Sequence, residues 1–137
     1  MRKSSRILVS AASGLLLATG GLMTATTAGA AETGNSSVQA CYDGARSYSK
    51  ASGARYYPNP GSYLTTTSAC NDINIKPKTD RYVAVCFKPS SGSDYCQGSY
   101  KLAKANQWTA IATDVTNGTR FYFDFRSTAA SNGSWAA

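Results

Sequence analysis

The chain has 137 residues, with four cysteines, nine tyrosines, no histidine and a formal net charge of +7. The missing histidine excludes Ser-His-Asp and Cys-His nucleophile systems, imidazole ligands for zinc, and acid–base catalysis by imidazole. Lysine and arginine are scattered, with no run of three, which argues against a nucleic-acid-binding surface.

The first thirty residues are typical of a Sec signal peptide. Three cations precede an apolar stretch, and residues 28–30 supply the small side chains that signal peptidase requires. The cations are Arg2, Lys3 and Arg6. We expect cleavage after Ala30 and secretion of a mature chain of 107 residues to the extracellular space. Cleavage lowers the net charge to +4 and removes the only long hydrophobic segment, so we expect no membrane association.

All four cysteines follow the signal. They are Cys41, Cys70, Cys86 and Cys96. In an oxidising compartment they are expected to pair as two disulfides, so they supply neither metal ligands nor thiol nucleophiles. Cross-links suit a chain of this size, because its hydrophobic core is modest.

The mature chain divides into three predicted parts. Residues 31–39 are small and polar and predict a flexible leader, and residues 40–126 predict one β domain. Residues 127–137 predict a loose tail, with docking of Trp135 onto the domain as the alternative. Strand-like segments are expected at 61–67, 72–76, 81–88, 95–102, 108–115 and 119–126, with one or two more between 45 and 57. This pattern predicts an all-β fold, a small antiparallel sandwich or barrel of about six or seven short strands with two disulfides.

One predicted hairpin suggests the disulfide pairing. Pairing strands 81–88 and 95–102 symmetrically about Ser91 places Cys86 opposite Cys96, at a separation that a cross-strand disulfide can bridge. Cys41 and Cys70 then pair with each other. The alternative joins Cys41 to Cys96 and Cys70 to Cys86.

A second predicted hairpin joins strands 108–115 and 119–126. A three-residue loop with Gly118 in the left-handed region puts Ile111 and Val115 on the same face as three alternating phenylalanines. These are Phe121, Phe123 and Phe125. We interpret this face as core; a two-residue Asn-Gly loop would give a different register.

Carboxylates are the only remaining candidates for catalytic side chains. Glycoside hydrolysis needs two carboxyl groups that face each other across a cleft. The acidic residues here occur at turn-like positions or where an ion pair accounts for them, and no phosphate-binding or dinucleotide motif is present. We therefore expect no enzymatic activity, no cofactor and no metal site.

Aromatic side chains are the candidates for a binding surface. Nine tyrosines are too many for the core of so small a domain, and tyrosine and tryptophan rings stack well on sugars and at protein interfaces. Arg55, Tyr56 and Tyr57 begin a loop stiffened by two prolines, and Trp108 begins a strand, so these four are the candidate binding residues. The competing interpretation is an ordinary turn with one buried tyrosine and a half-buried Trp108.

Two motifs occur in succession. The first is a Val-Cys-Phe hairpin, made of residues 82–87 with Cys96, and the second is a Trp-to-Gly-Thr-x-Phe hairpin, made of residues 107–115 and 118–121. This pattern resembles small secreted actinobacterial disulfide-linked β-proteins of unassigned function, over about residues 70–126. The resemblance implies an extracellular location and a compact β fold, and it transfers no catalytic or binding residue.

Two functions of different classes fit these observations. The first is a secreted non-catalytic binding protein for cell-wall or other extracellular polysaccharide. The second is a proteinaceous inhibitor of a secreted hydrolase, a protease or an amylase, that presents loop 55–61 or loop 89–94. A polymer binder is expected to expose several aromatic rings on one sheet face, whereas an inhibitor is expected to present one protruding, well-held loop. In either case we expect a monomer.

Overall fold

The computed structural model describes residues 38–137, so the predicted signal peptide and residues 31–37 of the predicted leader lie outside the described residues. A short helix, 38–43, precedes ten strands, and no helix in the described part is long and apolar enough to cross a bilayer. The strands are β1 (Arg46–Lys50), β2 (Tyr56–Tyr57), β3 (Leu64–Thr65), β4 (Ile73–Pro77), β5 (Arg81–Phe87), β6 (Tyr95–Cys96), β7 (Lys101–Ala103), β8 (Thr109–Ala112), β9 (Arg120–Phe125) and β10 (Ser131–Ala136).

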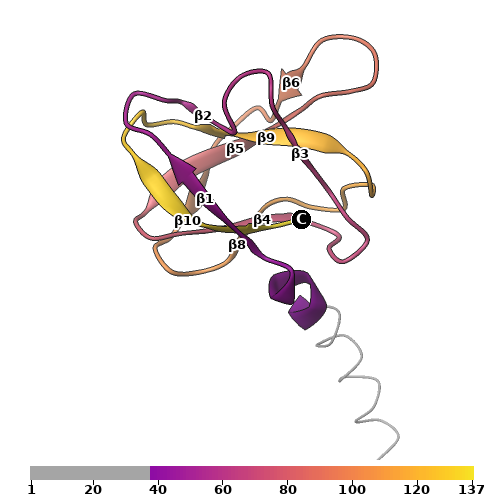
Figure 1. The fold of residues 1–137 in the computed structure, drawn as a ribbon, viewed down its shortest axis with the longest axis horizontal. Helices are drawn as coiled ribbons and strands as arrows, with labels where there is room; N and C mark the ends of the chain where they lie inside the picture. The colour runs from indigo at the N-terminus through magenta and orange to yellow at the C-terminus, as the bar shows by residue number, and fades with distance from the viewer. Residues whose placement is uncertain (1–37) are drawn as a thin grey trace, which may run out of the picture. The chain divides into compact units, whose positions relative to one another are not determined.

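The strands form two antiparallel sheets that pack as a sandwich. One sheet has the order β1-β10-β4-β8. In the other, β9 and β5 are the central strands; β2 and β3 pair with the outer edge of β9, and β6 and β7 with the outer edge of β5. Figure 1 shows the sheet that contains β9 and β5 lying across the sheet that contains β4 and β10. The predicted all-β class is therefore confirmed, with more strands than the six or seven expected.

The core lies between the two sheets. Phe121, Phe123 and Phe125 alternate along β9 and are fully buried, as the sequence pattern predicts. Ile73 and Ile75 of β4 meet them from the opposite sheet and are also fully buried. Burial of side chains of this size stabilises the fold by roughly 1.5–3 kcal/mol each.

Both disulfides pair as the hairpin symmetry predicts. Cys86 lies opposite Cys96 in the register of β5 and β6, and the two are bonded, as are Cys41 and Cys70. The alternative pairing is thereby excluded. The second bond ties the helix to the segment before β4, since Cys41 lies in the helix and Cys70 three residues before Ile73.

The predicted strand 95–102 is interrupted after Cys96. The backbone N–H of Gln97 still donates to the Val85 carbonyl at 2.9 Å, but the return bond from Val85 is made to the Gln97 side chain. Its Oε1 accepts a hydrogen bond from the backbone N–H of Val85 at 2.9 Å, and its Nε2 donates to the carbonyl of Ile111 at 3.0 Å. Val85 belongs to β5 and Ile111 to β8, so one side chain links the two sheets. Pairing with β5 resumes at β7.

The predicted hairpin of 108–115 with 119–126 is wrong. β8 pairs with β4, whereas β9 pairs with β5, so the two segments belong to different sheets. Gly118 has the positive φ that was expected, 81°, but its N–H donates to the carbonyl of Thr66. The Thr66 hydroxyl donates to the Thr116 carbonyl and accepts from the Thr119 N–H. The loop is therefore anchored on residue 66 and crosses from one sheet to the other.

The predicted loose tail, 127–137, is also wrong, because residues 131–136 form β10 between β1 and β4. Its small residues suit a tightly enclosed strand: a Cβ on Gly133 would clash with the carbonyl oxygen of Lys76 and lie 2.8 Å from Pro77 Cα. Trp135 is buried in the core. At the other end, residues 38 and 39 are helical, so the predicted boundary of the leader at residue 39 is two residues late.

Candidate functional site

An aromatic cleft lies at one end of the β2-β9-β5 sheet, on the face that points away from the core. It has a volume of about 200 Å³. Three tyrosines and two prolines line it, namely Tyr56, Tyr63, Tyr122, Pro58 and Pro60. We call the space between these five residues the cleft.

Strand alternation directs two of the tyrosines outward. Tyr122 lies between the buried Phe121 and Phe123, so its side chain points to the opposite face of β9. Tyr56 of β2 pairs with Asp124, the next outward position of β9. The two rings are 5.6 Å apart and nearly perpendicular, at 83°, an edge-to-face contact that fixes both orientations.

The loop between β2 and β3 supplies the rest of the apolar wall. Its backbone is restricted by Pro58 and Pro60, by a turn in which Ser62 N–H donates to Asn59 O at 3.0 Å, and by the positive φ of Gly61, 98°. Tyr63 follows and remains 38% exposed. The cleft is thus largely formed before any ligand arrives.

Charged groups border the cleft. Lys88 Nζ lies 3.6 Å from Asp94 Oδ1, and the hydroxyl of Tyr122 donates to the other Asp94 oxygen at 3.1 Å. Burial, together with the hydrogen bond to Asp94, raises the pKa of Tyr122, so this hydroxyl stays a donor. Two cations, Lys88 Nζ and Arg120 Cζ, lie 5.4 and 5.3 Å from the centre of the Tyr63 ring.

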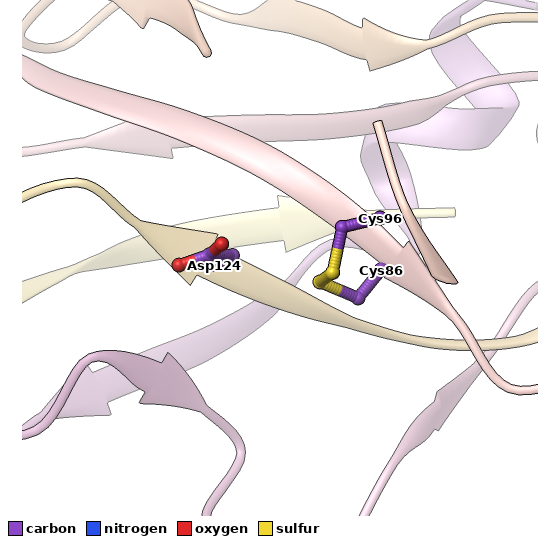
Figure 2. Close-up of side chains that lie close together, drawn as sticks. All are labelled: Cys86, Cys96 and Asp124. Atoms are coloured by element: carbon purple, nitrogen blue, oxygen red, sulfur yellow. A yellow bond between two sulfur atoms is a disulfide. The ribbon is translucent and has the colours of Figure 1, made fainter. Parts of the chain in front are cut away.

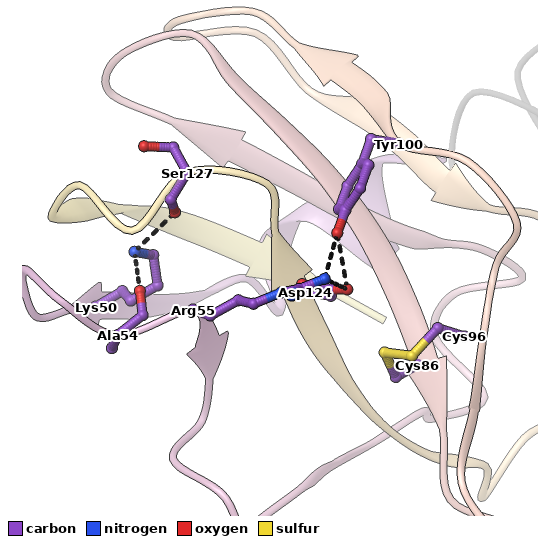
Figure 3. A network of polar contacts seen from close by, with 8 residues as sticks. All are labelled: Lys50, Ala54, Arg55, Cys86, Cys96, Tyr100, Asp124 and Ser127. Carbon is purple, nitrogen blue, oxygen red and sulfur yellow. Dashed lines mark hydrogen bonds and ion pairs between the residues drawn. A yellow bond between two sulfur atoms is a disulfide. The ribbon is translucent and has the colours of Figure 1, made fainter.

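A buried carboxylate supports the cleft from beside it. Asp124 is 5% exposed; it accepts from Arg55 Nε at 2.7 Å and from the hydroxyl of Tyr100 at 3.1 Å (Figure 3). The Arg55 guanidinium also lies 5.5 Å from the Tyr56 ring, so this network fixes the wall of the cleft. The hydrogen bond to Asp124 raises the pKa of Arg55, which stays charged.

The same carboxylate lies beside the Cys86–Cys96 disulfide. Cys86, Cys96 and Asp124 have their ligand atoms within 4.8 Å of one another, the one such group among residues 38–137 (Figure 2). The two cysteine sulfurs form a disulfide, so neither is available as a thiolate ligand for a metal ion. The arrangement is a packed disulfide and not a metal centre.

The structure brings only part of the predicted set together. Tyr56 lines the cleft and Arg55 lies against it, but Tyr57 turns toward the core, where its ring is 5.5 Å from that of Tyr48. Trp108 stacks on Tyr42 at 4.5 Å and 2°, in a separate cluster around the Cys41–Cys70 disulfide. That arrangement matches the half-buried packing considered as the competing interpretation.

Four residues of the site have no counterpart in the sequence prediction, namely Tyr63, Lys88, Asp94 and Tyr122. The alternation of β9 was a usable signal for Tyr122, because the residue between two core phenylalanines must face outward. The predicted hairpin about Ser91 already places Lys88 opposite Asp94, whereas Tyr63 reaches them only because β3 and β5 both pair with β9. No family model, curated protein or solved structure matches this chain.

Proposed function

We propose that the protein is a secreted, non-catalytic binding protein that holds one ring of an extracellular polysaccharide in the cleft. The observation that carries the proposal is the grouping of three tyrosine rings, with the polar rim of Lys88 and Asp94, around a volume of about 200 Å³. Tyrosine offers an apolar ring for the face of a sugar and a hydroxyl for its edge. Pockets for drug-sized ligands measure ~300–1,000 Å³, so this cleft suits one ring of a chain that continues outside it.

Rigidity supports the same proposal. The two prolines, the turn after Asn59 and the clamp of Arg55 on Asp124 already restrict the wall. A preformed site loses little conformational entropy when it binds, so a shallow contact retains useful affinity. Both disulfides are consistent with the oxidising extracellular location that the proposal requires.

The engagement of the nearby carboxylates supports a non-catalytic role. Asp94 is paired with Lys88 and accepts from Tyr122, and Asp124 is paired with Arg55 and accepts from Tyr100. A glycoside hydrolase needs one carboxylic acid with a raised pKa and a second carboxylate across the substrate. Both carboxylates near the cleft are therefore already engaged by partners within the protein, and the chain has no histidine to replace them.

Retention on insoluble polymers tests the proposal. The oxidised mature protein is incubated with peptidoglycan, chitin and cellulose from low salt to about 1 M. We expect retention on at least one polymer that survives high salt, because stacking is insensitive to screening. Tyr63→Ala is expected to abolish it, whereas Tyr82→Ala should not. Tyr82 is a matched control, since it has the same 38% exposure and its own arginine neighbour, Arg126 at 3.7 Å.

The control is also well separated from the cleft. Tyr82 and Lys88 lie six residues apart along β5 and its extension, which corresponds to about 20 Å in a strand. Absence of retention on all three polymers, with no binding of a soluble acidic or neutral oligosaccharide either, would contradict the proposal. Equal loss in the two variants would instead place binding elsewhere on the molecule.

Inhibition of a secreted hydrolase is the second candidate, favoured by one feature. Residues 90–95 are exposed, and the loop that carries them is closed at its base by the Cys86–Cys96 disulfide; Figure 1 shows it extending beyond β6. Held loops of this kind suit insertion into an active site. A panel of secreted proteases and amylases tests it, and inhibition that is lost in Ser91→Pro but kept in Tyr63→Ala would favour this candidate.

A further inference from the structure

We infer that the polysaccharide is acidic, a uronate polymer whose ring carboxylate lies between Lys88 and Arg120. The inference rests on the proposed function and names the ligand class of the same site. It is carried by a second groove next to the cleft and by an unbalanced positive charge where the two meet.

The second groove has a volume of about 390 Å³. Phe87, Pro89, Tyr95 and Arg120 line it, and Lys88 lines both this groove and the cleft. Tyr95 is 60% exposed and lies 5.4 Å from the Phe87 ring, which gives the groove an aromatic wall. A chain with one ring in the cleft therefore has a second site available for the next unit, with Lys88 at the junction.

The junction carries a net positive charge. Lys88 and Arg120 face the same Tyr63 ring, and the backbone N–H of Lys88 donates to the Arg120 carbonyl at 2.9 Å. Asp94 balances one of these charges, at 3.6 Å from Lys88 Nζ. Within residues 38–137 no carboxylate lies at ion-pair distance from Arg120. Arg55 differs, because it already forms an ion pair with Asp124.

The geometry favours a carboxylate attached directly to the sugar. A guanidinium presents a planar fork of donors that matches a carboxylate in two parallel hydrogen bonds. Both cations contact Tyr63, which itself lines the cleft, so their ligand group lies next to a ring stacked there. The exocyclic carboxylate of a uronic acid meets this requirement, because it is one bond away from the ring.

Calorimetric titration of the oxidised mature protein with two matched probes tests the inference. The probes are oligogalacturonic acid and its carboxyl-reduced, neutral counterpart, at 0.15 M salt to suppress long-range attraction. Hydrogen bonds to charged groups are stronger than those between neutral groups, so we expect the acidic probe to bind at least tenfold more tightly. Arg120→Gln should remove most of this preference. Lys104→Gln, an exposed lysine that lines neither site, should leave it unchanged.

The outcomes separate the two proposals. If both probes bind with equal affinity and Arg120→Gln changes neither affinity, the inference of an acidic ligand is overturned, but the proposal of polysaccharide binding stands. An equal loss in Lys104→Gln would also overturn it, because net charge alone would explain the preference. If neither probe binds, the inference of an acidic ligand is overturned. If peptidoglycan, chitin and cellulose also fail to retain the protein, the proposed function is overturned too. If Arg120→Gln does not fold, Lys88→Gln provides the same comparison.

Discussion

Replacement of Gln97 by methionine provides the most informative test of how the sandwich is held together. Methionine has a similar length and can fill the same space, but it has neither the amide oxygen that accepts from Val85 nor the amide nitrogen that donates to Ile111. Both backbone partners belong to buried residues, Val85 at 0% and Ile111 at 2% exposure, so water has little access to them.

The expected loss of stability follows from these two orphaned groups. An unsatisfied buried donor or acceptor costs about 1–3 kcal/mol, so the two together predict a loss of about 2–6 kcal/mol. Urea denaturation with the disulfides intact measures it, as a lower midpoint at constant slope. A loss below about 1 kcal/mol would refute the reasoning, because it would mean that water or a backbone shift satisfies both groups.

Gln97→Glu refines the test through its pH dependence. Glutamate keeps the acceptor for Val85, but an ionised carboxylate repels the Ile111 carbonyl, whereas the protonated acid can donate to it. The folded state therefore raises the pKa of this carboxyl above its ordinary value of about 4.3. The stabilising contribution is present below that pH and is lost as the pH rises through the raised value, so the variant should approach the wild type near pH 4 and fall behind at pH 7.

Three further predictions concern other parts of the fold. Lys50 is 3% exposed and donates to the carbonyls of Ala54 and Ala129. In urea denaturation, Lys50→Met should therefore lower the free energy of unfolding by about 1–3 kcal/mol. The control Lys78→Met, at an exposed lysine, should change it by less than about 0.5 kcal/mol. Gly133→Ala should cost about 1–3 kcal/mol or more, because its Cβ meets the Lys76 carbonyl, whereas Gly98→Ala, with open space around it, should be nearly neutral by thermal unfolding. Burial raises the pKa of Tyr48, so above pH 10 the folded state holds a proton that the unfolded state has lost; stability should fall as the pH rises, and Tyr48→Phe should reduce that slope.

Features encoded over short distances were predictable from the sequence. The symmetric spacing about Ser91 placed Cys86 opposite Cys96, and the remaining disulfide followed by elimination. The phenylalanines of β9 alternate with polar residues, and this period-two pattern identified the buried face whichever strand lay beside it. Such patterns depend on a few neighbouring residues, so tertiary structure did not override them.

Features that depend on distant pairing were not predictable. Ile111 and Phe121 do face one core, but from opposite sheets, because the loop between them pairs with residue 66 and not with itself. β10 has weak strand propensity, and it is ordered because β1 and β4 offer backbone partners on both sides. The cleft depends on the same long-range pairing: Tyr63 and Lys88 come from segments that meet only after β3 and β5 both pair with β9.

The most direct test of the proposed function is an NMR titration that follows the ring signals of the nine tyrosines as a soluble oligosaccharide is added. The probe is a fragment of whichever polymer retains the protein. Binding in the cleft predicts saturable shifts at Tyr56, Tyr63 and Tyr122, with Tyr48 and Tyr82 unchanged. Saturable shifts confined to Tyr42 and Tyr82, or no saturable shift at any ring, would contradict it.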